Sequence, residues 1–252
     1  MSGASTLRIV EIFPGLLGTY GDHGNLLVLA DRARRRGFEV ETSSIAPGQP
    51  IPAQGDIYLI GGGEDAAQTA ATGLLRSDPV FSSLVAGNRP MLAVCAGLQM
   101  LGSVFPGLDG KPVSGLDLVD LRTVAGRVRA VGEIAARPAA ELELPTLTGF
   151  ENHQGRTQLG VDTVPLARVL AGIGNGDGRE GVVSGRLIGT YLHGPVLVRN
   201  PALADLLLSW AVGPVAPLAQ PHVEALRAER LRAVRRSKGR LARLARLARP
   251  RA

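Results

Sequence analysis

Short apolar runs alternate with amphipathic stretches along the first half of the chain. Apolar residues cluster at 7–13, 57–60 and 91–94 and alternate with polar ones at 38–42, and each of these runs predicts a strand. Between them, apolar positions recur at helical spacing over residues 25–36, from about residue 64, and near 79–86. Asn25 is a candidate cap for the first helix, and Gly37 follows its end. This alternation predicts an α/β fold with a doubly wound, mostly parallel sheet.

The second half of the chain is richer in predicted strands. Residues 127–134, 146–151 and 187–191 are strand-forming runs, and six glycines within residues 172–185 predict a hairpin turn. Residues 202–212 have helical spacing, after which Pro214, Pro217 and Pro221 indicate the exit from the domain. We therefore expect one domain over residues 1–213 and a C-terminal extension over residues 214–252.

The charge of the chain belongs almost entirely to that extension. A net charge of +6 and a pI of about 10.4 suggest a nucleic-acid partner at first. However, residues 222–252 hold 11 Arg and Lys against two Glu, a net charge of +9. The other 221 residues hold 17 basic and 20 acidic residues, a net charge of −3. Since aromatic residues are only 4% of the chain, we expect no base-stacking surface and no nucleic-acid partner.

The extension has two interpretations. Its last residues repeat Arg-Leu-Ala, and Leu241, Leu244 and Leu247 would form a short apolar stripe on a helix. We favour a solvated, partly disordered basic extension. The alternative is attraction to an anionic membrane surface.

Cysteine usage and the N-terminus restrict the class of protein. One cysteine excludes a disulfide framework and a multi-cysteine metal site, and no His spacing resembles a zinc site, so we expect no metal. Residues 1–9 lack the pattern of a signal peptide, and no apolar run reaches about 18 residues. We expect a cytoplasmic protein whose membrane contact, at the inner face, is limited to the extension.

Cys95 is the candidate nucleophile. It directly follows the apolar run 91–94, and the small residues Ala93 and Gly97 flank it at −2 and +2, as a sharp strand-to-helix turn requires. A helix beginning after Cys95 would favour its thiolate, and the Ala96 N–H would face a developing oxyanion. The alternative is a buried cysteine that packs as a small apolar residue.

Two further features should lie near Cys95, because the carboxyl ends of parallel strands meet at one edge of a sheet. His193 follows the strand at 187–191 and suits a general base, although a structural loop histidine is the alternative. Gly61 to Gly63 follow the strand at 57–60. They form either a simple turn or a loop whose N–H groups, at Gly62 and Gly63, complete an oxyanion hole.

The other histidines carry weaker signals. His153 lies in what we interpret as a polar, Gly-bounded loop, and His23 lies beside Asp22 in another. Each fits a place in the pocket wall or an ordinary structural role. His222 lies in the extension, where we expect it to be solvated.

Four motifs, in order, resemble class I (triad-type) glutamine amidotransferases. CAGLQ at 95–99 resembles their C-x-G-x-Q nucleophile motif, and GGGED at 61–65 resembles their oxyanion loop. YLHG at 191–194 and GFENHQGRT at 149–157 are similar to the branch that contains cobyric acid synthase. The resemblance covers roughly residues 7–212 and implies the fold of that class. It implies catalytic roles for Cys95 and His193, and glutamine binding by a further set: Arg129, Gly62, Gly63, Ala96 and Gln99.

Within this branch, YGDHGN at 20–25 and the absence of a preceding ATP-binding domain resemble the glutaminase subunits of lipid II isoglutaminyl synthases. That implies release of ammonia from L-glutamine for peptidoglycan synthesis. The ammonia would amidate the D-glutamate α-carboxyl of the lipid II stem peptide to D-isoglutamine. It implies a Mur-ligase-like partner, MurT, that carries ATP and Mg²⁺, with no cofactor in this chain. Alternatives are a cobyrinate-type amidotransferase, a stand-alone glutaminase, or a non-catalytic amidotransferase-like module.

The chain departs from the class I pattern at one position. Most class I enzymes have Glu two residues after the catalytic His, where this chain has Pro195. A proline cannot orient the imidazole, so the orienting acid is either Asp22 or a group of the partner subunit. We hypothesise that hydrolysis by the isolated chain is weak and rises on complex formation.

Overall fold

The apolar runs 57–60 and 91–94 become the two central strands of the protein. The computed structural model describes residues 6–161 and 163–247, with the backbone alone for residues 235–247. β3 (Ile57–Ile60) and β4 (Met91–Val94) are fully buried at the middle of a six-stranded sheet of order β11-β12-β4-β3-β1-β2. The other strands are β1 (Leu7–Ile12), β2 (Val40–Ile45), β12 (Leu187–Thr190) and β11 (Val182–Ser184). Only the β11–β12 pairing is antiparallel, so the predicted mostly parallel sheet is confirmed.

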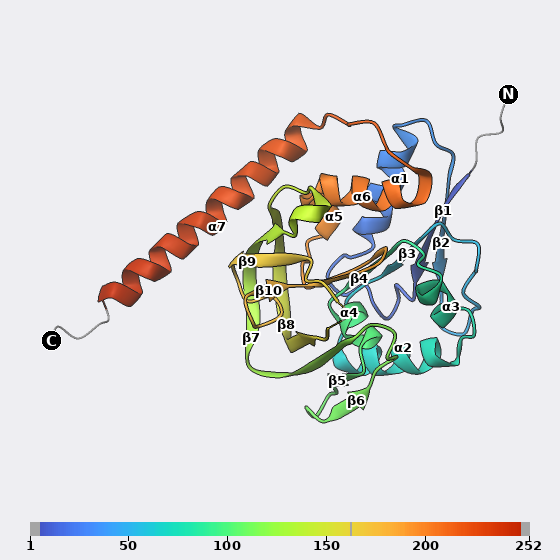
Figure 1. The fold of residues 1–252 in the computed structure, drawn as a ribbon, viewed down its shortest axis with the longest axis horizontal. Helices are drawn as coiled ribbons and strands as arrows, with labels where there is room; N and C mark the ends of the chain where they lie inside the picture. Colours follow the sequence, from blue (N-terminus) through green and yellow to red (C-terminus); the bar gives the residue numbers. More distant parts are fainter. Residues whose placement is uncertain (1–5, 162, 248–252) are drawn as a thin grey trace.

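Helices cover both faces of this sheet (Figure 1). α1 (Gly24–Arg34) and α6 (Pro201–Val212) lie on one face, and α2 (Asp65–Ser77) and α4 (Ala96–Leu101) lie on the other. The short helices α3 (Phe81–Ala86) and α5 (Val196–Arg199) precede β4 and α6. The predicted capping by Asn25 is wrong, because its side-chain oxygen accepts a hydrogen bond from the Leu197 N–H at 3.0 Å. Asn25 instead fastens α1 to α5.

A second, antiparallel sheet of order β10-β9-β7-β8 was not predicted as a separate layer. Its strands are β7 (Leu121–Pro138), β8 (Leu147–Leu159), β9 (Ala167–Ala171) and β10 (Arg179–Glu180), and the turn Ala140–Leu142 lies between β7 and β8. The predicted strands 127–134 and 146–151 are thus parts of much longer strands. The glycine-rich region 172–185 holds the β9–β10 turn and also β10 and β11. A small hairpin, β5 (Val104–Pro106) with β6 (Pro112–Ser114), precedes β7.

The second sheet is fastened to the carboxyl end of β12. Phe150 and His193 exchange two backbone hydrogen bonds of 3.0 and 2.9 Å. The buried Glu180 carboxylate accepts hydrogen bonds from the Thr190 hydroxyl at 2.5 Å and the Tyr191 N–H at 2.9 Å. Side chains of β7 and β8 therefore lie opposite the strand ends of the main sheet.

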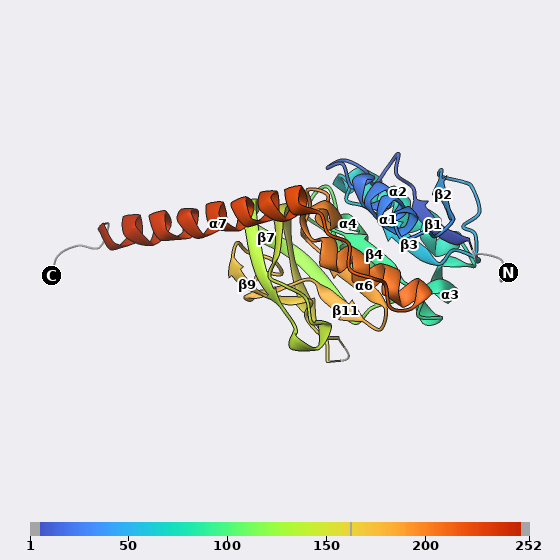
Figure 2. The same ribbon diagram turned by 90° about the horizontal axis from the view of Figure 1, so that it is seen from above.

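Residues 221–247 of the C-terminal extension form a helix, whereas we favoured a partly disordered segment there. α7 (Pro221–Leu247) runs across the second sheet and extends past it (Figures 1 and 2). Arg227 donates a hydrogen bond to the Thr146 carbonyl, and Val234 is buried. These contacts order the first turns, because they offset the entropy that a free basic segment would keep. The predicted stripe of Leu241, Leu244 and Leu247 lies outside the described side chains.

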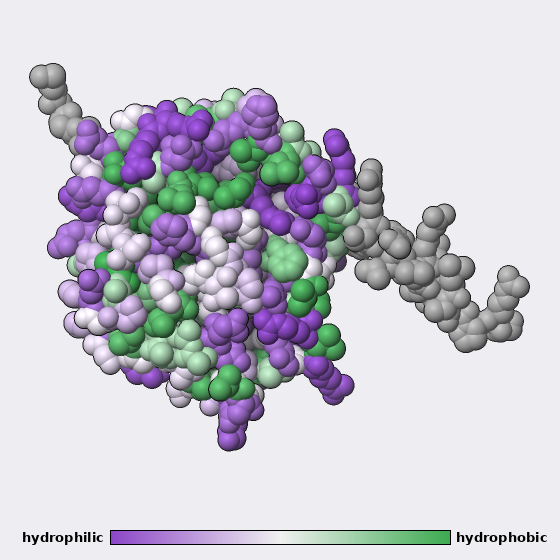
Figure 3. All heavy atoms as spheres, turned by 180° about the vertical axis from the view of Figure 1, so that it is seen from behind, coloured by the Kyte–Doolittle hydropathy of each residue, from purple (hydrophilic) through white to green (hydrophobic). Residues whose placement is uncertain are grey.

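On the face in Figure 3, hydrophobic residues lie in separate patches between hydrophilic ones. Within the described residues, no helix combines the length and hydropathy of a membrane span.

A buried ion-pair cluster joins α1, α6 and the segment before α7. Arg32 is 3% exposed and donates two hydrogen bonds to the Asp205 carboxylate, at 2.8 and 2.6 Å. Its third nitrogen donates to the Gln220 side chain, and Arg36 lies 2.9 Å from Asp205. A buried guanidinium of this kind depends on its carboxylate, because desolvation is costly without it.

We predict that Asp205→Ala lowers the free energy of unfolding by about 3 kcal/mol in urea denaturation, because it strands the buried Arg32 charge. Asp31→Ala is the matched control, since it breaks the exposed pair between Asp31 and Arg35 on the same helix. That control is expected to cost less than about 0.5 kcal/mol. Equal decreases in the free energy of unfolding of the two variants would contradict the claim that burial of Arg32 makes its ion pair important.

Candidate functional site

Cys95 lies at a strained turn between β4 and α4. Its backbone adopts φ 51° and ψ −102°, a left-handed region that costs a non-glycine residue on the order of 1–3 kcal/mol. Its N–H donates to the Thr190 carbonyl at 2.8 Å, so β12 holds the turn in place. Gly97 is required here, since a Cβ would lie 2.9 Å from the Ile60 carbonyl oxygen. This is the predicted strand-to-helix turn, with the sulfur at the carboxyl edge of the sheet.

The three glycines after β3 are required by close packing. A Cβ on Gly61 or Gly63 would collide with the carbonyl oxygen of Leu17 or Leu16, because the loop after β1 runs alongside. A Cβ on Gly62 would lie 2.8 Å from His193 Cε1, and 3.3 Å from both Asp22 Oδ2 and the Cβ of Cys95. Cys95, His193 and Asp22 therefore converge at Gly62. The fold class predicted that Cys95 and His193 would lie near this loop.

Asp22 contacts the imidazole of His193. Both carboxylate oxygens lie 3.3 Å from His193 Nδ1, and both side chains are buried. Asp22 Oδ2 also accepts a hydrogen bond of 2.8 Å from the Gly62 N–H. Of the two alternatives for the orienting acid, Asp22 is thus already in place within this chain, and Pro195 makes no such contact.

That last hydrogen bond corrects one expectation. Because the Gly62 N–H is engaged by Asp22, it is not free to face an oxyanion, and its predicted role in the oxyanion hole is wrong for this structure. Within the described part of the chain, the N–H groups of Gly63 and Ala96 have no acceptor. These two remain as candidate oxyanion donors.

The surroundings of His193 favour its protonated form. Burial by itself lowers the pKa of the imidazole, but the adjacent Asp22 carboxylate and Cys95 thiol outweigh it and raise the pKa of His193 to about 10. Nδ1 faces Asp22, whereas the buried Nε2 has no hydrogen-bond partner among the described residues. Nε2 is therefore the nitrogen left to exchange a proton with Cys95.

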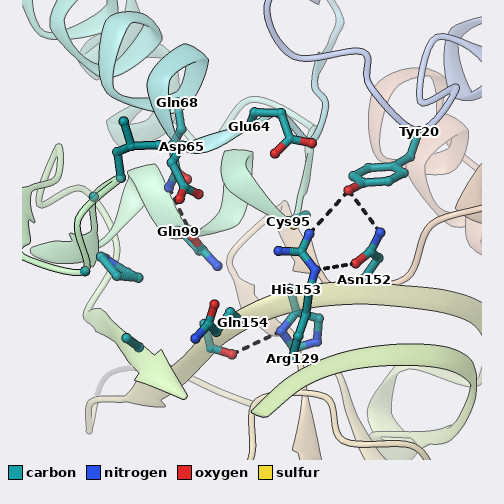
Figure 4. A pocket seen from close by; sticks show the side chains of 17 residues that line it. Tyr20, Glu64, Asp65, Gln68, Cys95, Gln99, Arg129, Asn152, His153 and Gln154 are labelled. Carbon is teal, nitrogen blue, oxygen red and sulfur yellow. Dashed lines mark hydrogen bonds between the residues drawn. The ribbon is translucent and has the colours of Figure 1, made fainter. Parts of the chain in front are cut away.

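A cavity of about 280 Å³ opens beside Cys95. Its walls come from the loop after β1, the start of α2, the β5–β6 hairpin, and strands β7 and β8 (Figure 4). Arg129 lines one side, and Glu64 and Asp65 line the cavity as well. The cavity thus offers both signs of charge, which suits a small zwitterion next to a thiol.

Arg129 forms hydrogen bonds with two residues that we did not predict as site residues from the sequence. Its Nε donates to Asn152 Oδ1 at 2.7 Å, and its Nη2 donates to the Tyr20 hydroxyl at 3.4 Å. Asn152 Nδ2 also donates to the Tyr20 hydroxyl, at 3.0 Å. Both Tyr20 and Asn152 stand inside motifs quoted for the family resemblance, and their roles depend on contacts between distant strands.

Gln99 lines the cavity but is engaged within the protein. Its amide nitrogen donates to the Tyr191 hydroxyl at 3.1 Å, and its oxygen accepts from Gln68 at 3.1 Å. The Tyr191 hydroxyl also lies 2.7 Å from the Thr157 hydroxyl. The predicted binding of substrate by Gln99 stays a prediction, and its contacts fix the floor of the cavity.

His153 is not in a loop, as we expected, because residues 149–157 lie within the continuous strand β8. Its buried ring stacks on Tyr191 at 3.8 Å, and it lines the cavity. His23 lies 2.7 Å from the Glu11 carboxylate and does not line the cavity, and His222 is exposed at the start of α7. Among the described residues, no cluster of three His, Cys, Asp or Glu side chains is arranged to hold a metal ion.

Comparison with known proteins identifies the family. The model of the CobB/CobQ-like glutamine amidotransferase domain matches residues 8–201. The chain belongs to the CobB/CobQ-like glutamine amidotransferase family. Cys95, His193 and Arg129 all lie within the matched residues.

Two curated relatives of this amidotransferase share one name. The chain is 35% identical over 209 residues to the lipid II isoglutaminyl synthase (glutamine-hydrolyzing) subunit GatD of Staphylococcus aureus strain N315, covering 81% of this chain and 84% of that protein. It is 34% identical to GatD of Streptococcus pneumoniae, covering 82% and 80%. The cobyric acid synthase of Sphingopyxis alaskensis is 34% identical over 68% of this chain, but only 34% of that protein is covered.

Solved structures confirm the predicted fold type. A glutamine amidotransferase of Thermotoga maritima superposes with a TM-score of 0.51 at 16% identity, over 81% of this chain and 80% of that one. The glutaminase domain of Trypanosoma brucei CTPS with bound acivicin gives 0.52 at 12% identity, over 85% and 97%. At such identities the likeness establishes the fold alone.

We predict that Gly62→Ala lowers kcat/KM for glutamine hydrolysis about 100-fold, because the added methyl group displaces His193 from Asp22 and Cys95. Gly73→Ala in α2 is the matched control, since a Cβ there meets nothing within 4 Å. The control keeps its activity, and a helix interior favours Ala over Gly by roughly 0.5–1 kcal/mol. A fully active Gly62→Ala enzyme would refute the convergence of the three side chains at Gly62.

Proposed function

We propose that this chain is the glutamine-hydrolysing subunit of a lipid II isoglutaminyl synthase. The observation that carries the proposal is the placement of His193 between the Asp22 carboxylate and Cys95, beside a charged cavity of about 280 Å³. A cysteine, a base and an acid that orients the base make up the machinery of nucleophilic acyl transfer.

The cavity suits L-glutamine. Arg129 provides a guanidinium for the α-carboxylate, and Glu64 and Asp65 provide carboxylates for the α-ammonium. With these ends held, the side-chain amide extends toward Cys95. The same charges disfavour simple aliphatic amides, because the charged walls would then lack partners.

The first half of the reaction forms a thioester. His193 acts as the base: Nε2 takes the proton of the Cys95 thiol and leaves a thiolate. The thiolate attacks the δ-carbon of glutamine, and the Gly63 and Ala96 N–H groups stabilise the oxyanion. The C–N bond then breaks, and the Nε2 proton passes to the leaving nitrogen, which departs as ammonia.

The second half returns the enzyme to its starting state. Neutral His193 takes a proton from water, and the resulting hydroxide attacks the γ-glutamyl thioester. The C–S bond breaks, glutamate leaves, and the thiolate again faces the imidazolium. Asp22 holds the ring in one tautomer throughout, since Nδ1 stays directed at its carboxylate.

The ammonia then serves a second subunit. Its proposed partner is a Mur-ligase-like protein, MurT, on which ATP and Mg²⁺ activate the D-glutamate α-carboxyl of the lipid II stem peptide. Ammonia displaces phosphate from that activated carboxyl and gives D-isoglutamine. The proposal is supported by the names of the two relatives, each of which is a subunit of such a synthase.

A cobyrinate-type amidotransferase is the second candidate. The S. alaskensis relative shares the family and a similar identity. However, the matches to the two GatD proteins cover 81% and 82% of this chain, whereas the match to that cobyric acid synthase covers 68%. More of this chain therefore resembles the GatD proteins, which supports the first candidate.

The proposal is tested by measuring glutamate release from L-glutamine, with the chain alone and in complex with the Mur-ligase-like protein. We expect weak hydrolysis by the chain alone and at least about tenfold more in the complex. Cys95→Ala should lower both rates at least about 1,000-fold, because it removes the nucleophile. His193→Gln should be similarly inactive, and the exposed His222→Gln is the matched control that keeps full activity.

Three outcomes would count against the proposed function. Hydrolysis by Cys95→Ala at the wild-type rate would show that Cys95 is not the nucleophile. Equal rates for the chain alone and for the complex would show that hydrolysis does not depend on a partner. Amidation of cobyrinate in place of lipid II would show that the chain is a cobyrinate-type amidotransferase.

We predict that Asp22→Asn lowers kcat by roughly 10²–10⁴, as loss of an orienting carboxylate does in triad enzymes. It should also lower the pKa of His193 from about 10 toward the ordinary value of 6.5, because a carboxylate that stabilises the imidazolium is gone. The imidazolium is then lost at a lower pH than in the wild type. An NMR titration of labelled histidine follows this change, with His193 assigned by its absence in His193→Gln.

Asp31→Asn is the control for this variant, since it changes a carboxylate of the exposed pair with Arg35. It should leave both kcat and the titration of His193 unchanged. An Asp22→Asn protein with wild-type kcat and an unshifted His193 would show that the orienting acid lies elsewhere.

A further inference from the structure

Tyr20 lies at a junction that the reaction described above does not use. It belongs to the loop between β1 and α1, two residues before Asp22. Its hydroxyl oxygen accepts hydrogen bonds from Arg129 on β7 and Asn152 on β8 (Figure 4). One oxygen thus connects the loop at the edge of the main sheet to the second sheet, at the wall of the cavity.

The contacts of Tyr20 determine where the Arg129 guanidinium lies. Asn152 Oδ1 accepts from Nε, and Tyr20 accepts from Nη2, so two sides of the guanidinium are fixed. Among the described residues, Nη1 has no acceptor, and neither has the hydroxyl proton of Tyr20. A hydroxyl that accepts two hydrogen bonds still has its own proton to donate. Nη1 and the Tyr20 O–H are therefore two free donors at one wall of the cavity.

The Tyr20 ring also lies against the imidazole. The centroids of the Tyr20 and His193 rings are 4.7 Å apart, with the planes tilted by 55°. Burial and the nearby negative charge of Glu64 raise the pKa of the Tyr20 hydroxyl, so it stays protonated at neutral pH. A neutral hydroxyl donates to a carboxylate, whereas a phenolate would repel it.

The hydroxyl is not needed to hold the loop itself. Asp22 in the same loop accepts a hydrogen bond from the Gly62 N–H at 2.8 Å, and the Thr19 N–H donates to the Gly62 carbonyl at 3.3 Å. These contacts fix the loop next to β3 whether or not Tyr20 has its hydroxyl. Its bonds to Arg129 and Asn152 therefore act on the cavity wall.

From this arrangement we infer that Tyr20 is a specificity-determining residue: its hydroxyl positions the Arg129 guanidinium and donates its own proton to the α-carboxylate of the substrate. The inference rests on the proposed function, since it concerns recognition of L-glutamine at the same site. It assigns selection for amino-acid amides to Tyr20 and Arg129 together. The aromatic ring keeps a separate task, which is to cover His193.

The test uses Tyr20→Phe in the full-length chain, in complex with its partner if the complex is needed for activity. We expect KM for L-glutamine to rise about tenfold and kcat to stay within about twofold, because the variant loses substrate binding and keeps the ring over His193. A general loss of folding would lower kcat or the active fraction instead.

Alkylation gives a second measurement that does not depend on turnover. Cys95 is the one cysteine of the chain, so iodoacetamide labelling reports on it alone. The labelling rate of Tyr20→Phe should match the wild type, because the probe carries no carboxylate. The L-glutamine concentration that protects Cys95 should rise about tenfold.

Tyr58→Phe is the matched control. The Tyr58 hydroxyl donates to the Pro52 carbonyl at 2.5 Å and accepts from the Gly55 N–H, within the body of the domain. This variant also loses one hydrogen-bonded tyrosine hydroxyl, and it should change neither KM nor the protecting concentration. Thermal unfolding checks that both variants are folded.

The outcomes separate this inference from the proposed function. A wild-type protein that neither hydrolyses glutamine nor is protected by it overturns the function, and the inference with it. A wild-type protein that does both, with Tyr20→Phe unchanged in KM and protection, overturns the inference alone. A fall in kcat at constant KM also overturns it, since Tyr20 would then act on the chemical step.

Discussion

The site depends on one close approach, that of the Gly62 backbone to the side chains around it. No side chain fits at Gly62, because a Cβ would lie 2.8 Å from His193 and 3.3 Å from Asp22 and Cys95. The same residue donates its N–H to Asp22, which in turn contacts His193. The side chains of Asp22, Cys95 and His193, which follow three different strands, are thus all positioned around the Gly62 backbone. The strained backbone of Cys95 is tolerated because β12 holds the turn, through the hydrogen bond from the Cys95 N–H to the Thr190 carbonyl.

The second sheet converts this edge into a binding site. The main sheet supplies the sulfur, the imidazole and the carboxylate, whereas β7 and β8 supply Arg129 and Asn152. Tyr20 joins the two groups, since it extends from the loop that carries Asp22. The buried Glu180 secures the docking through Thr190 and Tyr191, at the cost of a carboxyl group whose burial raises its pKa to about 7.

The sequence predicted the features that local pattern controls. The wholly apolar runs became β3 and β4, and the small residues around Cys95 predicted its sharp turn. Contacts between distant segments could not be predicted from local pattern. Asn25 was expected to cap a helix, yet its side-chain oxygen accepts a hydrogen bond from the Leu197 N–H. Gly62 looked like an oxyanion donor, yet its N–H binds a carboxylate 40 residues earlier in the chain. The long strands β7 and β8 were only partly predicted, because polar residues on their exposed positions interrupt the hydrophobic pattern.

The central claim is that Cys95 becomes covalently acylated by glutamine. The most direct measurement is an acid quench of the full-length protein during turnover of radiolabelled L-glutamine, followed by peptide mapping. The account predicts label on the peptide that contains Cys95, lost on treatment with hydroxylamine because that reagent cleaves thioesters. Turnover of glutamine with no label on that peptide, under conditions in which a thioester added as a standard survives the quench, would contradict it.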